Sequence, residues 1–217
     1  MLELALVLGF GALAISGSKL RDDEMSAVPR RLSDRLGRLW DIAHQGMRDN
    51  RFLRAEKALL TILKIDQKNA AAYNRLGILY AKQKEYRDAI DCFEIASSIE
   101  STPSSLHNLG LIYYETENYE KAAIAFEQAL KLEDDLAARH VAYAKVQEKL
   151  GNHKIMLQEL EIAVELEPNH ESYNLLKKAY ENLGLDEEVK KLNKKIGKMT
   201  DSSNKRRRMM RPRRVVI

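Results

Sequence analysis

Apolar residues recur along this chain at the three- and four-residue steps of an α-helix, in runs separated by short polar breaks. Between residues 69 and 134 the pattern occurs twice, with a period of 33 residues. A period of this length predicts stacked repeats, and the two runs within each copy predict one helix pair per repeat. The repeated positions are Tyr73, Leu76, Gly77, Tyr80, Tyr86, Ala89, Phe93 and Ala96 in the first copy and Leu106, Leu109, Gly110, Tyr113, Tyr119, Ala122, Phe126 and Ala129 in the second.

The order of these residues, a large residue, Leu-Gly, Tyr, Tyr, Ala, Phe and Ala, resembles the tetratricopeptide repeat. The glycines and alanines let two helix backbones approach closely, while the aromatic side chains fill the space between them. Because one helix pair cannot bury its apolar face alone, stacked pairs are needed to build a continuous core. The resemblance implies an all-α, right-handed superhelical solenoid that binds other proteins.

Weaker copies extend the pattern on both sides of the two clear repeats. A displacement of 34 residues places a degenerate first repeat before them and a fourth repeat after them. A fifth pair has Lys177 and Asn193 where the clear copies have glycine and phenylalanine, which suits a terminal cap whose outer face meets water. We therefore expect about five helix pairs, at about 36–69, 70–102, 103–136, 137–169 and 170–199.

The chain begins with an apolar segment, because residues 2–18 contain a single charge, Glu3. A helix of this length spans roughly 25 Å against a hydrocarbon core of roughly 30 Å, so residues 1–18 are predicted to form one transmembrane anchor. Basic residues follow from Lys19 onward, which places the repeats on the cytoplasmic side of the membrane. The membrane is expected to be a bacterial inner membrane. Residues 19–35 form a polar tether. A cleaved secretory signal and a buried or interfacial helix remain as alternatives for the first segment.

The end of the chain, residues 200–217, is predicted to be a basic disordered tail. The whole chain carries a formal charge of +4, and the tail's basic cluster leaves about −3 for the remainder. The tail could contact anionic lipid, contact RNA or DNA, or bind nothing specific, and an anchored chain favours lipid. The basic cluster consists of Lys205, Arg206, Arg207, Arg208, Arg211, Arg213 and Arg214.

The resemblance also implies that the first helices of the pairs line a concave groove. Its side chains mix aromatic, aliphatic, amide and charged groups, which suits an extended peptide or a helix of a partner protein. Trp40 and His44, four residues apart, are the most suggestive pair, although Trp40 could instead pack against the tether or the next repeat. The expected groove residues are Trp40, His44, Asn74, Ile78, Lys82, His107, Leu111, Tyr114, Glu115, Val141, Lys145 and Glu148.

One branch of the family grips the carboxyl-terminal peptides of chaperones with Lys, Asn and Arg side chains. The matching positions here are Trp40, His44, Arg75, Ser104 and Asn108, so this clamp is absent in that register. A role in binding chaperone tails is therefore disfavoured.

No arrangement of residues in the sequence points to catalysis, a metal or a cofactor. The five histidines are spread over the repeats, and the chain lacks HExxH spacing, a phosphate-binding Gly-rich loop and a serine elbow. Cys92 is the only cysteine, so no internal disulfide can form, and its surroundings predict a packed, inert thiol. We therefore expect no enzyme, no cofactor and no small-molecule substrate.

Together these features predict a membrane-anchored scaffold or adaptor whose groove binds a partner protein in the cytoplasm. Two alternatives remain: an exported or periplasmic repeat protein in envelope assembly, and a nucleic-acid- or ribosome-associated protein that uses residues 205–214. The layout, including the opening Met1-Leu2-Glu3-Leu4, is similar to that of a longer membrane-anchored bacterial repeat scaffold that regulates lipopolysaccharide assembly. That scaffold ends in a Cys-rich metal module, which this chain lacks, so its specific role is not carried over.

Overall fold

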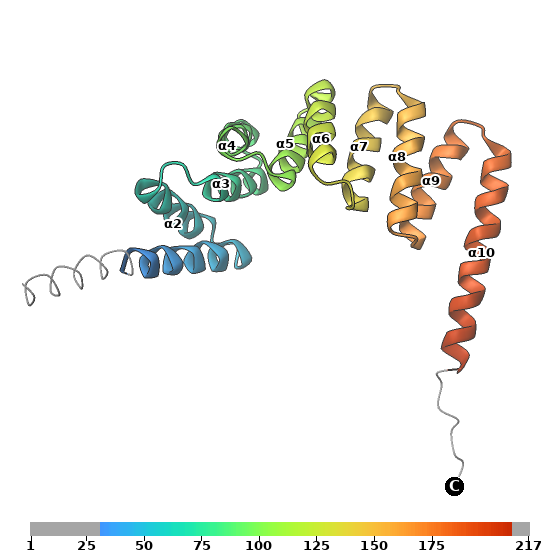
Figure 1. The fold of residues 1–217 in the computed structure, drawn as a ribbon, viewed down its shortest axis with the longest axis horizontal. Coiled ribbons are helices and arrows are strands. Elements are labelled where there is room, and N and C mark those ends of the chain that lie inside the picture. The colour runs from blue at the N-terminus through green and yellow to red at the C-terminus, as the bar shows by residue number, and fades with distance from the viewer. Residues whose placement is uncertain (1–30, 210–217) are drawn as a thin grey trace, which may run out of the picture. The chain divides into compact units, whose positions relative to one another are not determined.

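The computed structural model describes residues 31–209, with side chains as far as residue 197, and over that range it contains helices and no strands (Figure 1). The chain divides into two compact units, Met1–Glu85 (unit 1) and Tyr86–Ile217 (unit 2). Unit 1 has a helix over residues 31–48, α2 (Phe52–Ile65) and α3 (Ala70–Gln83). Unit 2 has α4 (Tyr86–Ile99), α5 (Pro103–Glu115), α6 (Tyr119–Leu132), α7 (Ala137–Lys149), α8 (His153–Leu166), α9 (His170–Asn182) and α10 (Asp186–Met209).

A short turn within each helix pair contains one residue with a left-handed backbone. These residues have φ between 56° and 75° and recur every 33 or 34 residues. The left-handed conformation ends the first helix and redirects the chain into the second. Five such turns lie within residues 31–209, which confirms the predicted five pairs. The turn residues are Asn50 and Lys84 in unit 1, and Glu117, Gly151 and Gly184 in unit 2.

Side-chain caps begin the first helices of three pairs. Asn69 accepts a hydrogen bond from the backbone amide of Ala72 at the start of α3. Thr102 and Asn169 each form a reciprocal capping box, with Ser105 at the start of α5 and with Ser172 at the start of α9. Because the first amides of a helix have no partner within it, these caps fix where the helices begin.

The small residues of the repeat pattern and its two phenylalanines are buried, as the sequence predicts, whereas Tyr73, Tyr80, Tyr86 and Tyr119 are half-buried. In unit 2 each helix packs against the next one along the chain. Exclusion of these apolar side chains from water is the main favourable term that holds neighbouring helices together. The residues with exposed fractions of 0–1% include Ala89, Phe93 and Ala96 on α4 and Ala122, Phe126 and Ala129 on α6.

The first pair has a close backbone approach that its degenerate sequence does not reveal. The repeat register places Ala43 at the glycine position, and Ala43 is fully buried. The tight contact lies three residues later, where a Cβ built on Gly46 would stand 2.9 Å from the backbone nitrogen of Ala55. Gly46 is therefore the position at which this helix and α2 need a residue without a side chain.

A recurring hydrogen bond links tyrosines of the first helices to glutamates of neighbouring second helices. In each case the phenol donates a hydrogen bond to a carboxylate oxygen in a partly buried pair, so the ring fills space and its hydroxyl has a partner. The pairs are Tyr80 with Glu56 at 2.9 Å, Tyr113 with Glu94 at 2.5 Å and Tyr180 with Glu161 at 2.6 Å.

Two predicted boundaries differ from the structure. Residues 31–35, which the sequence places in the tether, already belong to the first helix. Residues 200–209, which it places in the disordered tail, continue α10 to Met209. Residues 200–209 include neither proline nor glycine, so no strong helix breaker ends the helix earlier. The predicted anchor at 1–18 lies outside the described residues, and no helix within them is long and apolar enough to cross a membrane.

The predicted cap at the end of the repeats is partly solvated. Asn193 on α10 is exposed, and Lys177 on α9 is half-buried with its Nζ 3.5 Å from a carboxylate oxygen of Glu181. Leu192 still packs into the core formed with α8 and α9. The last pair therefore buries one face and leaves polar side chains on another.

Candidate functional site

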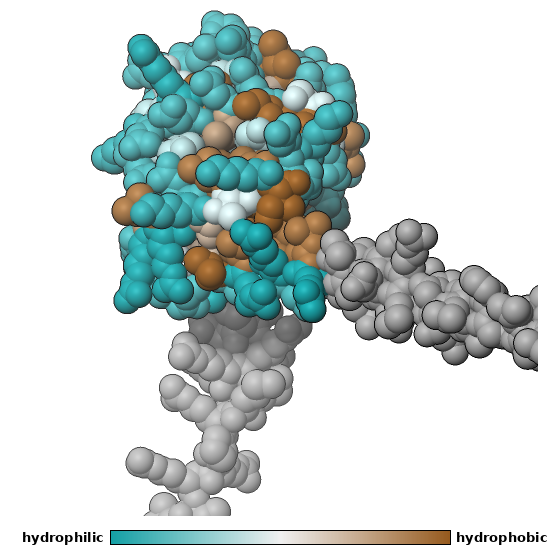
Figure 2. All heavy atoms as spheres, turned by 90° about the vertical axis from the view of Figure 1, so that its left-hand side faces the viewer, coloured by the Kyte–Doolittle hydropathy of each residue, from teal (hydrophilic) through white to brown (hydrophobic). Residues whose placement is uncertain are grey.

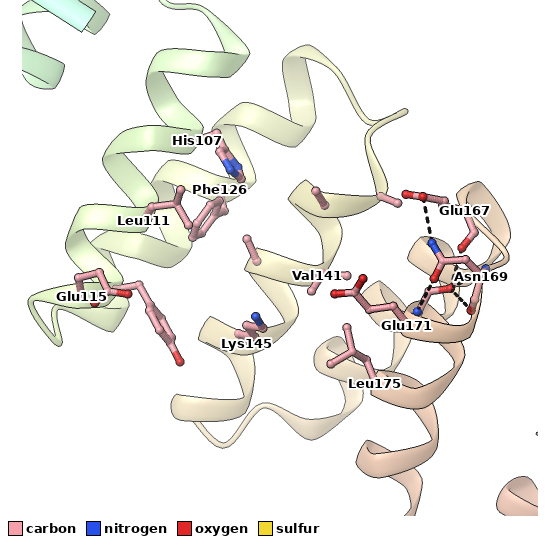
Figure 3. A pocket seen from close by; sticks show the side chains of 15 residues that line it. His107, Leu111, Glu115, Phe126, Val141, Lys145, Glu167, Asn169, Glu171 and Leu175 are labelled. Atoms are coloured by element: carbon pink, nitrogen blue, oxygen red, sulfur yellow. Dashed lines mark hydrogen bonds between the residues drawn. The ribbon is translucent and has the colours of Figure 1, made fainter. Parts of the chain in front are cut away.

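Unit 2 contains a hollow of about 400 Å³ formed mainly by the first helices of three successive pairs, α5, α7 and α9 (Figure 3). We call it the unit-2 hollow. This arrangement follows from the repeat, because the same helix face recurs at each step of the stack. Its lining residues are His107, Leu111, Tyr114, Glu115, Phe126, Ala137, Ala138, Val141, Ala142, Lys145, Glu167, Asn169, Glu171, Ser172 and Leu175.

Small residues on α7 create this space. Ala138 and Ala142 lie on one face of that helix, four residues apart, and leave room that larger side chains would fill. Around them, Leu111 is 38% exposed, and Val141 and Leu175 are half-buried. The hollow therefore presents accessible apolar surface, which is the usual lining of a ligand pocket.

His107 stands in the wall of the unit-2 hollow with its ring against a core side chain. Its ring centroid lies 5.4 Å from that of Phe126, in an edge-to-face arrangement at 67°. Its Nδ1 atom is buried and has no hydrogen-bond partner among the described residues. Burial, and to a lesser extent the positive charge of Arg139, lowers the pKa of His107. The ring is therefore neutral at pH 7 and has an unused polar atom beside the hollow.

Lowering the pH below about 6.5, the ordinary histidine pKa, is expected to destabilise unit 2 through His107. Because the pKa is lowered in the folded state, the unfolded chain binds a proton at a higher pH than the folded chain does. The free energy of unfolding should therefore fall as the pH drops through this range, until the folded ring also becomes protonated. Urea unfolding between about pH 8 and about pH 5 should show a larger loss for the wild type than for His107→Gln. Equal losses would contradict this assignment.

Charged side chains surround the apolar part of the hollow. Glu115, Glu167 and Glu171 contribute carboxylates, and Lys145 contributes the one ammonium group among the lining residues (Figure 3). All four residues are exposed. Three carboxylates against one ammonium group favour a basic or amphipathic ligand over an acidic one. Because these charges are exposed, they steer and orient a partner more than they hold it.

Two polar residues of the lining have structural roles. Asn169 accepts a hydrogen bond from the backbone amide of Ser172, at 2.9 Å, and donates one to Glu167, also at 2.9 Å. The Ser172 hydroxyl donates to the backbone carbonyl of Glu167 at 2.6 Å. These contacts hold the start of α9, so both side chains position the helix that carries Glu171 and Leu175.

Half of the groove residues expected from the sequence meet at this one hollow. Glu148 lies at a smaller neighbouring hollow of about 160 Å³, which shares Val141 and Lys145. The residues that line the unit-2 hollow are His107, Leu111, Tyr114, Glu115, Val141 and Lys145. Their role in binding stays a prediction. Sequence reasoning missed the contributions of Phe126, the α7 alanines and the α9 residues, because it considered only one helix face of each central repeat.

The remaining expected groove residues belong to unit 1. His44, Ile78 and Lys82 line a second hollow of about 410 Å³, here called the unit-1 hollow. Trp40 packs against His44, with ring centroids 5.6 Å apart, and does not line that hollow. Asn74 does not line it either.

A further hollow of unit 1, of about 450 Å³, lies between the first helix and α2 and includes Leu39, Ile42 and Leu53. Leu53 is 64% exposed. Figure 2 shows hydrophobic residues gathered among hydrophilic ones on the face that this view presents.

Cys92 on α4 agrees with the prediction of a packed thiol. It is half-buried, and burial together with the nearby carboxylates of Asp88 and Asp91 raises its pKa to about 11. The thiolate, which is the reactive form, is therefore scarce at neutral pH. Within the described part of the chain, no group of His, Cys, Asp and Glu residues is arranged to hold a metal ion.

Comparison with known proteins places this geometry among repeat proteins. Residues 68–135 match a family model described as "Tetratricopeptide repeat". No curated protein sequence matches the chain significantly. Among solved structures, the MamA protein is similar over 80% of this chain and 96% of its own, with 22% identity and a TM-score of 0.70. MamA from Desulfovibrio magneticus RS-1 is similar over 78% of this chain and 97% of its own, with 13% identity and a TM-score of 0.69.

A third similar structure is YrrB, described as a TPR protein with an unusual peptide-binding site. The similarity covers 69% of this chain and 78% of YrrB, with 20% identity and a TM-score of 0.61. At these levels of identity the likeness establishes a shared fold.

Proposed function

We propose that this chain, whose residues 68–135 are tetratricopeptide repeats, is a protein-interaction scaffold and that the unit-2 hollow binds a peptide segment or helix of a partner protein. The observation that carries the proposal is accessible apolar surface inside a concave face. Leu111 remains 38% exposed beside Val141 and Leu175. The volume of about 400 Å³ falls within the range of roughly 300–1,000 Å³ that ligand pockets occupy.

The lining residues would make two kinds of contact with the partner. Leu111, Val141 and Leu175 would receive an apolar side chain of the partner and remove it from water, which supplies most of the binding free energy. Glu115 and Glu171 would orient basic groups at the ends of the segment. The peptide-binding site named for YrrB supports a similar use of the fold.

A photocrosslinking experiment on the full chain tests this proposal. A photoreactive residue at Tyr114 should capture one partner protein in the native cell. Leu111→Asp should reduce that capture by about tenfold or more, because a carboxylate would replace an apolar side chain of the lining. Ile124→Asp is the matched control: Ile124 is 55% exposed on α6 and does not line the hollow. Capture that is unchanged by Leu111→Asp, or lost equally with Ile124→Asp, would overturn the proposal.

We also propose that residues 1–18 anchor the repeats to the cytoplasmic face of a membrane. The support is the apolar composition of residues 2–18 and the basic residues that follow them. Digestion of intact membrane vesicles with an added protease tests the orientation. Repeats facing the cytoplasm are cleaved in inverted vesicles and protected in vesicles of native orientation, and the opposite result would contradict the proposal.

A further inference from the structure

The unit-1 hollow differs in chemistry from the unit-2 hollow. It lies between the first helix and α3, with a volume of about 410 Å³. Three of its side chains are cationic, and no carboxylate is among those that line it. The lining residues are His44, Met47, Arg48, Arg75, Ile78 and Lys82.

The three cations, Arg48, Arg75 and Lys82, are exposed, and none of them forms an ion pair with another described side chain. All six ion pairs among the described side chains lie in unit 2. Arg48 donates a hydrogen bond to the side-chain oxygen of Gln45 at 2.6 Å, and the Gln45 amide donates in turn to the Asp49 carboxylate at 2.9 Å. Three cations that share one hollow, with no carboxylate in its lining, create a positive potential that a ligand carboxylate would relieve.

The charge of the described part of unit 1 reinforces this potential. Residues 31–85 contain twelve Lys and Arg residues and six Asp and Glu residues, a net charge of +6. Residues 86–197 contain thirteen Lys and Arg residues and twenty-one Asp and Glu residues, a net charge of −8. The whole-chain total of +4 conceals this contrast, because it sums two parts of opposite charge.

The shape of the hollow selects the kind of anion. Met47, which is 8% exposed, and the half-buried Ile78 give it apolar walls between the cationic groups. An acidic peptide can place an aliphatic side chain between these walls while its carboxylates meet the guanidinium groups, which bind carboxylates in a two-pronged geometry. A flat lipid surface would meet the outward charges without filling the concave space.

We infer that the unit-1 hollow is a separate binding site for an acidic peptide segment of a partner protein, a refinement that rests on the proposed scaffold function. The two hollows then recognise different chemistry. The unit-1 hollow takes carboxylates around an aliphatic side chain, whereas the unit-2 hollow takes an apolar side chain flanked by basic groups.

Selection of random peptides displayed on phage against the immobilised full chain tests the inference. Peptides that depend on unit 1 should be enriched in Asp and Glu and should bind Arg75→Glu/Lys82→Glu about tenfold or more weakly than the wild type. Raising the salt concentration from about 50 mM to about 500 mM should weaken them as well, because screening shortens the reach of the cations.

Two control variants make the result specific. Lys64→Glu/Lys68→Glu changes the net charge of unit 1 by the same amount, and neither residue lines the hollow, so binding of acidic peptides should persist. Leu111→Asp should also leave them bound, whereas it should abolish binding of peptides specific to the unit-2 hollow. If peptides specific to the unit-2 hollow are selected but acidic peptides are not, only this inference is overturned. If neither class of peptide is selected, the proposed function is overturned too.

Two other outcomes would overturn the inference. One is selection without acidic enrichment, or acidic peptides that bind both charge-reversal variants equally. The other is binding to phosphatidylglycerol vesicles that Arg75→Glu/Lys82→Glu abolishes, with no acidic peptide selected, which would identify the cations as a membrane contact.

Discussion

Phe126→Ala is expected to lower the free energy of unfolding of unit 2 by about 3–5 kcal/mol. Phe126 is fully buried on α6. Its ring lies under Gly110, where a built Cβ would stand 2.9 Å from the Cζ atom, and at the edge of the His107 ring. Truncation would leave a cavity where α5 and α6 meet, because the backbones cannot close over the missing ring. Urea unfolding followed by circular dichroism measures the effect.

Ile124→Ala provides the comparison for Phe126→Ala on the same helix. Ile124 is 55% exposed, so its truncation should change the free energy of unfolding by only about 0.5 kcal/mol. A Phe126→Ala effect as small as that of Ile124→Ala would show that α6 is not held by the ring. Because Phe126 also lines the unit-2 hollow, the variant should bind the peptides of that hollow more weakly than its remaining folded fraction explains.

Gly46→Ala is expected to destabilise unit 1 by about 1–3 kcal/mol, although alanine is ordinarily the better helix former. The added Cβ would stand 2.9 Å from the backbone nitrogen and 3.0 Å from the Cβ of Ala55. These atoms cannot move aside as the end of a long side chain can, so α2 must shift. The loss of packing should exceed the gain of about 1 kcal/mol in helix propensity. Thermal unfolding of the full chain measures the net effect.

Gly37→Ala is the matched control in the same helix. A Cβ built on Gly37 has no neighbour within 4 Å. Only the propensity gain remains, so this variant should be more stable than the wild type by up to about 1 kcal/mol. Opposite signs for the two variants would establish the close approach at Gly46, and a stabilising Gly46→Ala would refute it.

The number of helix pairs could be predicted from the sequence because the signals that set it are local. Apolar residues at helical spacing mark each helix, and the break at Lys84-Glu85 coincides with a left-handed turn residue, Lys84. The same left-handed turn recurs at Gly151 and Gly184. Such features depend on a few neighbouring residues, so they survive in the degenerate outer repeats.

The groove could be predicted only in part. The repeat register places Leu111 and Lys145 on equivalent faces of first helices, and both line the unit-2 hollow. It does not reveal that Phe126 reaches the hollow from a second helix, or that Glu171 and Leu175 belong to it. These contributions depend on side-chain size and helix separation across three pairs, which no local pattern records.

The contrast between the two hollows could have been found in the sequence by summing charge over each half of the repeats. The whole-chain total of +4 conceals it, because a basic first part and a basic tail enclose an acidic middle. What the charges do, however, depends on where they lie. Arg48 and Lys82 stand one repeat apart in sequence, and only packing of the first helix beside α3 brings them to one hollow.

The sequence by itself determined an all-helical chain of about five pairs and the small residues and phenylalanines that are buried. Periodicity is sufficient for this, because helix spacing and repeat stacking follow from local residue types. Tertiary structure decided where backbones nearly touch, as at Gly46 and Ala55, and which side chains share a hollow. Those outcomes arise from close packing between helices, in which a difference of one methyl group opens or closes the available space.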